Sequence, residues 1–148
     1  MSRSEEAEKY FSDTFNCSQA VFAPFGKEMG LDEDQCLRIA TPFGGGMGRQ
    51  QLTCGAISGA LMVLGLIGGR GKSDDIKKKD EVYHKTVQFF DEFRKLHGSV
   101  SCRELLHNLD MNDPNDMKEI DRLELFKNSC PRYVKDAVAI IERLEKLD

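Results

Sequence analysis

Tryptophan is absent from this sequence of 148 residues, which also contains only 4 prolines and no long hydrophobic run. The most apolar stretch, GALMVLGLIGG at 59–69, is too short for a bilayer, which needs about 20 apolar residues. The charged first residues, MSRSEEAEKY, contain no apolar segment of the kind that a signal peptide requires. We therefore expect no membrane insertion and a cytoplasmic protein, whose thiols stay mostly reduced.

An excess of basic residues is also lacking. The chain has 21 Lys and Arg against 25 Asp and Glu, which gives a net charge of −4. No basic stripe is visible, so we expect no nucleic-acid partner. A chain of this length buries roughly 70% of its unfolded surface, so residues 1–148 are predicted to form a single domain that folds without disulfides.

Strand patterns are scarce, whereas helical periodicity and helix caps are frequent. The predicted helices span 4–11, 16–30, 32–41, 54–67, 73–96 and 114–127, with two more beginning at 101 and 130. The segment 54–67 is apolar nearly all round, which is typical of a buried central helix. Gly55 and Gly59, one turn apart, would let another helix approach it closely. The predicted fold is an all-α, compact single-domain bundle of about six to eight helices.

Four of the five cysteines share a local pattern, in which a residue that favours the N-cap position precedes the thiol. The pairs are Asn16-Cys17, Thr53-Cys54, Ser101-Cys102 and Ser129-Cys130. The start of a helix carries a partial positive charge that lowers the pKa of a nearby thiol and favours the thiolate. Because helix ends gather at one pole of a bundle, we expect these four thiols to converge.

Cys54 and Cys36 are expected to have different roles. Cys54 is the expected nucleophile, because its glycine neighbours would expose it and the preceding loop offers N–H donors; Cys17, Cys102 and Cys130 would be its resolving or relay partners. Cys36 lies inside a predicted helix among apolar residues, so we expect a core residue.

The glycine-rich stretch FGGGMGR at 43–49 matches neither the phosphate-binding loop nor the dinucleotide fingerprint. One interpretation is a tight turn that passes close to another backbone. The other is that Gly45, Gly46 and Arg49 line a pocket for an anion or a metal cluster, since the loop leads to Cys54. Both stay open.

The order of Cys17, the element CGAISG at 54–59, Cys102 and Cys130 resembles the C_GCAxxG_C_C family of redox-active proteins, which is defined by four cysteines and a Cys-Gly-Ala-x-x-Gly element. Neighbouring phrases such as NCSQAVF and CPRYV support the resemblance over nearly the whole chain. It implies redox activity, and for some members a bound prosthetic group such as an iron–sulfur cluster. It implies no particular substrate.

The sequence is compatible with three functions. The first is thiol–disulfide or electron-transfer chemistry on the four cysteines, which includes the activity of a thiol–disulfide oxidoreductase, with a redox partner protein or a small thiol or electron carrier. The second is a binding protein in which the same four thiolates hold an iron–sulfur cluster or zinc. The third is a helical interaction domain with incidental thiols. The sequence selects no oligomeric state and none of the three pairings that four cysteines allow.

Overall fold

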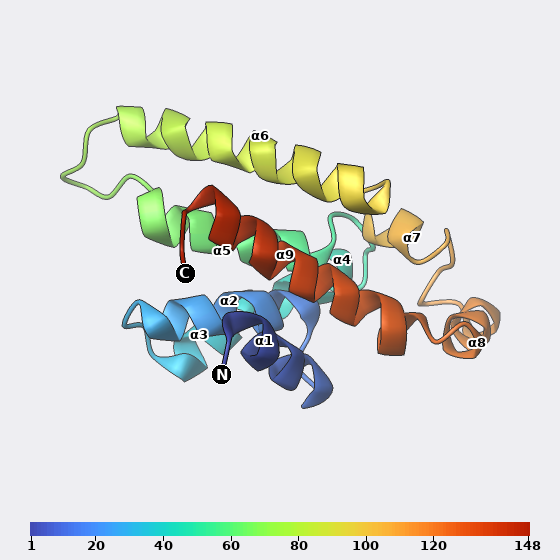
Figure 1. Ribbon diagram of the computed structural model, residues 1–148. Coiled ribbons are helices and arrows are strands. Elements are labelled where there is room, and N and C mark those ends of the chain that lie inside the picture. The colour runs from blue at the N-terminus through green and yellow to red at the C-terminus, as the bar shows by residue number, and fades with distance from the viewer.

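The apolar segment that was expected at the centre of the fold forms α5 (Gly55–Gly68) in the computed structural model, which describes all residues 1–148. It packs against α2 (Cys17–Glu28), α6 (Lys77–His97) and α9 (Cys130–Leu144), as Figure 1 shows. Ala56, Ile57 and Ala60 of α5 are fully buried. The buried central helix is therefore present, and it begins one residue later than the expected span 54–67.

The remaining elements complete an all-α fold. They are α1 (Arg3–Ser12), α3 (Glu33–Ala40), α8 (Pro114–Arg122), the four-residue turns α4 (Gly44–Met47) and α7 (Cys102–Leu105), the 3-10 turn η1 (Thr41–Phe43) and the π-helical turn η2 (Leu125–Ser129). Seven of the helices are eight residues or longer, which confirms the expected all-α bundle. None of the helices combines the length and the apolar character that crossing a membrane requires.

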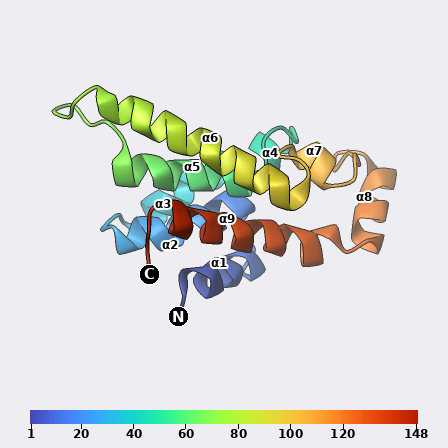
Figure 2. The same cartoon turned by 45° about the horizontal axis from the view of Figure 1, so that its top comes forward.

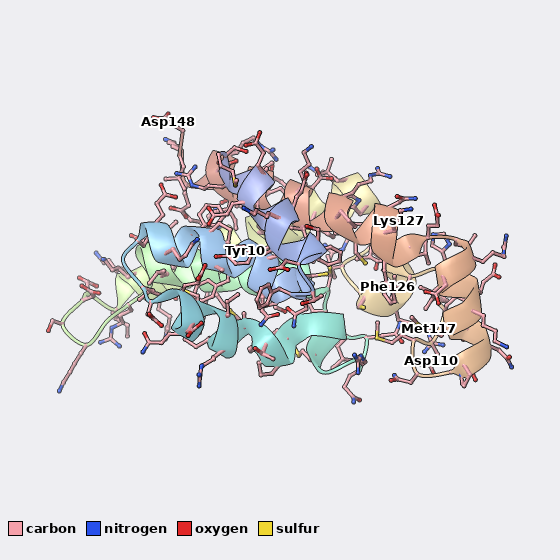
Figure 3. The ribbon with its side chains drawn as sticks, turned by 90° about the horizontal axis from the view of Figure 1, so that it is seen from below. Tyr10, Asp110, Met117, Phe126, Lys127 and Asp148 are labelled. Carbon is pink, nitrogen blue, oxygen red and sulfur yellow. The ribbon has the colours of Figure 1, made fainter.

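The bundle has two ends of different character. In Figure 2 the two termini lie near each other, whereas α7 and α8 lie at the end of the bundle away from the termini. The helix α6 runs along one side. The termini are joined by a hydrogen bond of 2.7 Å from the Arg3 guanidinium to the Asp148 carbonyl oxygen. Figure 3 shows Met117 and Phe126 at the α8 end, far from Asp148. The hydrophobic interior is likewise divided into two clusters.

A large core cluster is built from α1, α2, α3, α5, α6, α7 and α9, and it includes Phe25, Phe89 and Phe93. A small cluster lies at the α8 end and consists of Cys102, Leu106, Ile120, Leu125 and Cys130. Cys17 packs against both clusters. The junction between them is thus the place where cysteines from both clusters meet.

Glycines determine how closely α5 approaches α2. A Cβ atom at Gly59 would lie 2.6 Å from the Ser18 carbonyl oxygen, and one at Gly55 would lie 3.3 Å from the Cys17 Cβ. Any larger residue would push the two helices apart. The CGAISG element therefore brings the start of α5 against the start of α2, as the spacing of Gly55 and Gly59 predicted.

Two of the four predicted helix caps are wrong. Thr53 does not cap α5, because it pairs with Ser101 in an isolated antiparallel bridge, and Cys54 occupies the N-cap position with φ −52° and ψ 133°. Ser129 has helical dihedral angles and makes no capping hydrogen bond, because η2 runs directly into α9. The caps at Asn16 and Ser101 are present, and their side chains accept hydrogen bonds from the backbone of Gln19 and Glu104.

Candidate functional site

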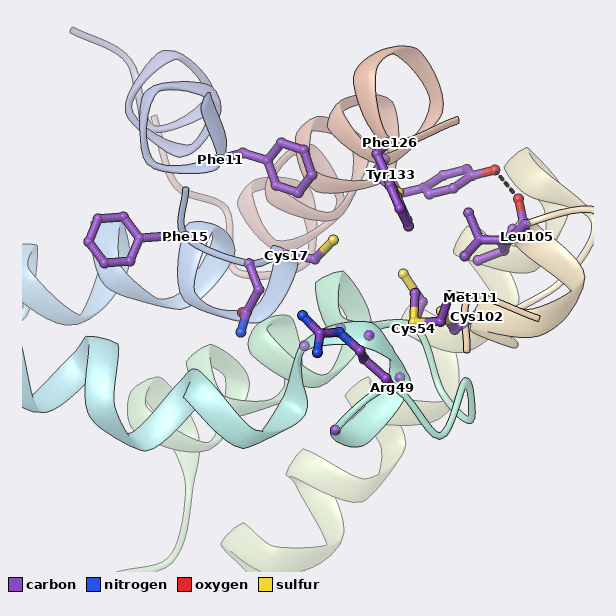
Figure 4. Close-up of a pocket in the computed structure, with 18 of the residues that line it drawn as sticks. Phe11, Phe15, Cys17, Arg49, Cys54, Cys102, Leu105, Met111, Phe126 and Tyr133 are labelled. Atoms are coloured by element: carbon purple, nitrogen blue, oxygen red, sulfur yellow. Dashed lines mark hydrogen bonds between the residues drawn. The ribbon is translucent and has the colours of Figure 1, made fainter. Parts of the chain in front are cut away.

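A single cavity of about 750 Å³ is lined by Cys17, Cys54, Cys102 and Cys130 (Figure 4). We call it the cysteine cavity. The fifth cysteine, Cys36, does not line it and is fully buried in the large core cluster, as expected for a core residue. All five cysteines are free thiols. The structure thus brings together the four thiols that follow the cap-like residues.

Cys54 and Cys102 are positioned by a short antiparallel pairing of two chain segments. The Cys54 N–H donates to the Val100 carbonyl at 2.9 Å, and the Cys102 N–H donates to the Leu52 carbonyl at 2.6 Å. These bonds flank the bridge between Thr53 and Ser101. The pairing joins the residue before α5 to the first residue of α7 and so places both thiols on one side of the cavity.

Cys17 and Cys130 come from the starts of α2 and α9. The Asn16 side chain and Gln19 form a reciprocal capping box that fixes the first turn of α2. Hydrogen bonding between the Cys17 and Cys130 side chains is the largest influence on the pKa of both thiols. These two cysteines therefore form a directly interacting pair within the cavity.

The acidity of the thiols differs from the expectation that all four would be easily ionised. Burial raises the pKa of Cys54 to about 12, and the N–H groups of Ala56 and Ile57 offset this effect only in part. Burial likewise raises the pKa of Cys102 to about 12. Cys54 is only 4% exposed. The expectation that its glycine neighbours would expose it to solvent is therefore wrong. At Cys54, loss of water around the thiolate outweighs the effect of the N–H groups at the helix start.

Cys130 is the exception among the four. The hydrogen bond from the Cys17 thiol lowers the pKa of Cys130, although its burial acts in the opposite direction. The same bond raises the pKa of Cys17 well above its ordinary value, and burial adds to the effect. Of the four thiols, Cys130 is therefore the one that ionises most readily, and its thiolate would be stabilised by the Cys17 S–H.

The glycine-rich stretch forms part of the cavity wall. Gly45, Gly46 and Arg49 all line the cavity, and all three have positive φ, at 67°, 66° and 65°. A Cβ at Gly46 would lie 2.7 Å from both the Cys102 Cβ and the Gln51 Cα, so the turn does pass close to another part of the chain. Both interpretations from the sequence are compatible with this geometry: a tight turn that is also a pocket wall.

Several lining residues gave no signal in the sequence. The aromatic wall of the cavity is made by Phe11, Phe15, Phe126 and Tyr133, and the Tyr133 hydroxyl donates to the Leu105 carbonyl at 3.0 Å (Figure 4). These residues come from both ends of the chain, and apolar side chains at helical spacing look the same whether they face a core or a cavity. Their role depends on tertiary packing alone.

Gln51 was also missed. It is 5% exposed, its side-chain amide donates to the Leu109 carbonyl at 2.8 Å, and its side-chain oxygen accepts from the Met111 N–H at 2.8 Å. These bonds hold the segment that brings Met111 to the cavity. A positive φ of 56° at a glutamine beside a glycine-rich turn is a structural signal that the sequence does not reveal.

The arrangement of the four thiols bears on which metal they could hold. No group of three or more His, Cys, Asp or Glu side chains in the chain is arranged to hold one metal ion. A zinc site needs four ligands within about 2.3 Å of a single ion, so the arrangement does not fit zinc. Four thiolates around one cavity do match the ligand chemistry of iron–sulfur clusters, which spread their cysteine ligands over several iron atoms.

Comparison with known proteins adds a family match. A family model described as "Putative redox-active protein (C_GCAxxG_C_C)" matches residues 15–144, a range that contains every cysteine lining the cavity. An uncharacterized protein of Archaeoglobus fulgidus is 27% identical over 121 residues, which cover 72% of this chain and 80% of that protein. No solved structure matches the chain.

Proposed function

Because the chain belongs to the C_GCAxxG_C_C family, we propose that it carries out thiol–disulfide exchange, with Cys130 as the attacking thiolate and Cys17 as the resolving thiol. The observation that supports this proposal is the packing of Cys17 against Cys130 in one cavity, where hydrogen bonding between the two side chains lowers the pKa of Cys130. A thiol that ionises more readily than its neighbours, placed beside a second thiol, is what the two-step exchange reaction requires. Cys54, the nucleophile expected from the sequence, is less suited because its pKa is raised to about 12.

The proposed reaction has two steps. The Cys130 thiolate attacks one sulfur of a partner disulfide, forms a mixed disulfide and releases one partner thiolate. Cys17 then loses its proton and attacks the Cys130 sulfur, which releases the second partner thiolate and leaves a disulfide between Cys17 and Cys130. The partner disulfide gains two electrons, and the protein dithiol is oxidised.

The hydrogen bond also explains the order of the steps. This bond is the largest cause of the raised pKa of Cys17, because an anionic Cys130 favours the form in which Cys17 keeps its proton. Once Cys130 is part of a mixed disulfide, its negative charge is gone and this effect ends. Cys17 becomes more acidic at the stage when it must attack. Cys54 and Cys102 line the same cavity and would receive the disulfide by further exchange.

The experiment is oxidation of the anaerobically purified, reduced protein with one equivalent of an organic disulfide, followed by peptide mapping with mass spectrometry. The expected first product is the disulfide between Cys17 and Cys130, in the wild type and in the control variant Cys36→Ser. A first disulfide between Cys54 and Cys102, with Cys17 and Cys130 still reduced, would contradict the assignment.

A second candidate is electron transfer by an iron–sulfur cluster. Cys17, Cys54, Cys102 and Cys130 would hold the cluster, which would supply one-electron chemistry. The observation in its favour is that all four thiols face one cavity. Visible absorption and iron analysis of anaerobically purified protein separate the two candidates: bound iron with a coloured protein supports the cluster, whereas colourless, iron-free protein that forms the Cys17–Cys130 disulfide supports exchange.

A further inference from the structure

The cysteine cavity is larger than a pair of reacting thiols needs. Its volume of about 750 Å³ lies in the range of small-molecule sites, which are typically about 300–1,000 Å³. Besides the four cysteines, eight of its 22 lining residues are hydrophobic, and four of these are aromatic: Phe11, Phe15, Phe126 and Tyr133. The cavity therefore offers apolar and aromatic side chains to a ligand that reaches the thiols.

The thiols are too enclosed for a folded protein partner. Cys54, Cys102 and Cys130 are 4%, 9% and 8% exposed. Thiol–disulfide exchange requires the attacking sulfur to reach the partner sulfur directly. A disulfide on the surface of another folded protein would have to enter the cavity to meet Cys130, whereas a small molecule enters without any rearrangement of the partner.

The charge of the cavity is one-sided. The 22 lining residues contain one arginine, Arg49, and no Lys, His, Asp or Glu. Arg49 takes part in none of the ion pairs of the protein. Arg49 is exposed, so its unpaired guanidinium lies at the rim of the cavity, where it can bind the charged group of an anionic ligand through charge-assisted hydrogen bonds, which are stronger than neutral ones.

Local structure fixes the backbone at Arg49 and leaves space for the stem of its side chain. The Asn112 side chain donates to the Arg49 carbonyl at 2.9 Å, and the Arg49 Cγ lies 3.0 Å from where a Cβ of Gly45 would be. A side chain at position 45 would displace the arginine stem. In Figure 4 the Arg49 guanidinium extends from the glycine turn toward the side of the cavity where Cys17 lies. The glycine turn thus leaves room for the arginine in the wall of the cavity that the reacting sulfurs also line.

We propose that the cysteine cavity binds a small organic anion with an apolar or aromatic body, anchored by Arg49, and that an organic disulfide of this kind is the oxidant of Cys17 and Cys130. The second half of this inference rests on the proposed function. In the reaction, the anionic group stays at Arg49 while the disulfide of the ligand reaches Cys130. Two ligand thiolates leave, one after each step, and the proton of Cys17 goes to solvent.

Binding is tested without any redox reaction. The probes are 2-naphthalenesulfonate, neutral 2-naphthalenemethanol and the (2-naphthylmethyl)trimethylammonium cation, titrated into reduced protein by calorimetry. The sulfonate is expected to bind about tenfold more tightly than the neutral ring, which corresponds to one charge-assisted contact, and the cation most weakly. Arg49→Gln should remove the preference, and the control Arg38→Gln, an exposed arginine outside the cavity, should keep it. Equal binding of all three probes, or an unchanged preference in Arg49→Gln, would overturn the proposal.

Reaction rates distinguish a failure of the proposed anion site from a failure of the proposed thiol–disulfide exchange. The reagents are 5,5′-dithiobis(2-nitrobenzoate), an anionic aromatic disulfide, and neutral 2,2′-dithiodipyridine, with formation of the Cys17–Cys130 disulfide as the readout. Arg49→Gln should slow the anionic reagent about tenfold and leave the neutral reagent at its wild-type rate. If both reagents form the disulfide at unchanged rates in Arg49→Gln, the anion site is wrong and thiol–disulfide exchange stands. If neither reagent forms the Cys17–Cys130 disulfide in the wild type, the proposed function itself fails.

Discussion

Cys17 and Cys130, at the starts of α2 and α9, interact through their side chains, and hydrogen bonding between them lowers the pKa of Cys130 and raises that of Cys17. Cys130 is thereby the most readily ionised of the four thiols, because the other three have raised pKa values through burial or through this bond. The bond links the two residues that are assigned to the first chemical steps.

Removal of the donor tests this relationship. In Cys17→Ala, the pKa of Cys130 should rise, because the thiolate loses its hydrogen bond while its burial remains. Alkylation of Cys130 by iodoacetamide, followed by mass spectrometry over a pH series, should become several-fold slower at neutral pH and shift to higher pH. The control variant Cys36→Ala, which changes a thiol outside the cavity, should leave the pH profile of Cys130 unchanged. An unshifted profile in Cys17→Ala would show that another group stabilises the thiolate.

The contact between α2 and α5 gives a prediction on stability. Gly59→Ala places a methyl group 2.6 Å from the Ser18 carbonyl oxygen, so the helices must separate. We expect a loss of about 2 kcal/mol in the free energy of unfolding, even after the better helix propensity of alanine is counted. The measurement is chemical denaturation of the reduced protein.

The same helix supplies the matched control for that variant. Gly65 lies in α5, is exposed, and an added Cβ there would meet nothing within 4 Å. Gly65→Ala should therefore stabilise the protein by up to about 1 kcal/mol. If both variants behaved alike, the close approach of α2 and α5 would not be what requires a glycine at position 59.

The convergence of the four cysteines was readable from the sequence because it depends on helix starts, and helix starts carry local signals. The capping residues Asn16 and Ser101 are local signals of this kind, and both caps are present. Thr53 carries the same signal and misled the prediction, because its backbone pairs with Ser101 from a distant part of the chain. A local rule cannot anticipate that competition.

The acidity of the thiols was not readable for a related reason. A pKa depends on what covers the sulfur, and Cys54 is covered by the packing of segments that are far apart in the sequence. The aromatic residues Phe11 and Phe126, from opposite halves of the chain, show the same limit: each has an ordinary apolar pattern, and only the fold places both on one cavity.

The hydrogen bonds of Gln51 predict a second structural effect. Gln51→Ala leaves the Leu109 carbonyl and the Met111 N–H without their partner in a buried region, and we expect a loss of about 2 kcal/mol in the free energy of unfolding. The neighbouring exposed residue provides the control, and Gln50→Ala should change stability by less than about 0.5 kcal/mol. Thermal and chemical denaturation measure both; equal effects would show that the buried bonds contribute nothing specific.

Burial of Cys54 makes stability depend on pH in the alkaline range. The folded protein keeps this thiol protonated up to a pKa of about 12, whereas in the unfolded chain the thiol ionises near its ordinary value of 9.0. Between these values the folded state binds one more proton than the unfolded state, so the free energy of unfolding falls as pH rises, by about 1.4 kcal/mol per pH unit for this group. At neutral pH the stabilising contribution is fully present.

The variant Cys54→Ala isolates this contribution from the other groups that titrate at high pH. At pH 7 it should be less stable than the wild type by about 1 kcal/mol, because a small cavity replaces the sulfur. As pH rises above about 9, the wild type should lose stability more steeply than the variant, and the two curves should converge and cross. Denaturant unfolding of fully reduced protein at half-unit pH steps measures both curves. Parallel curves would mean that Cys54 ionises as easily in the folded protein as in the unfolded chain, and Cys54 would then regain the claim to be the nucleophile that its place before α5 first suggested.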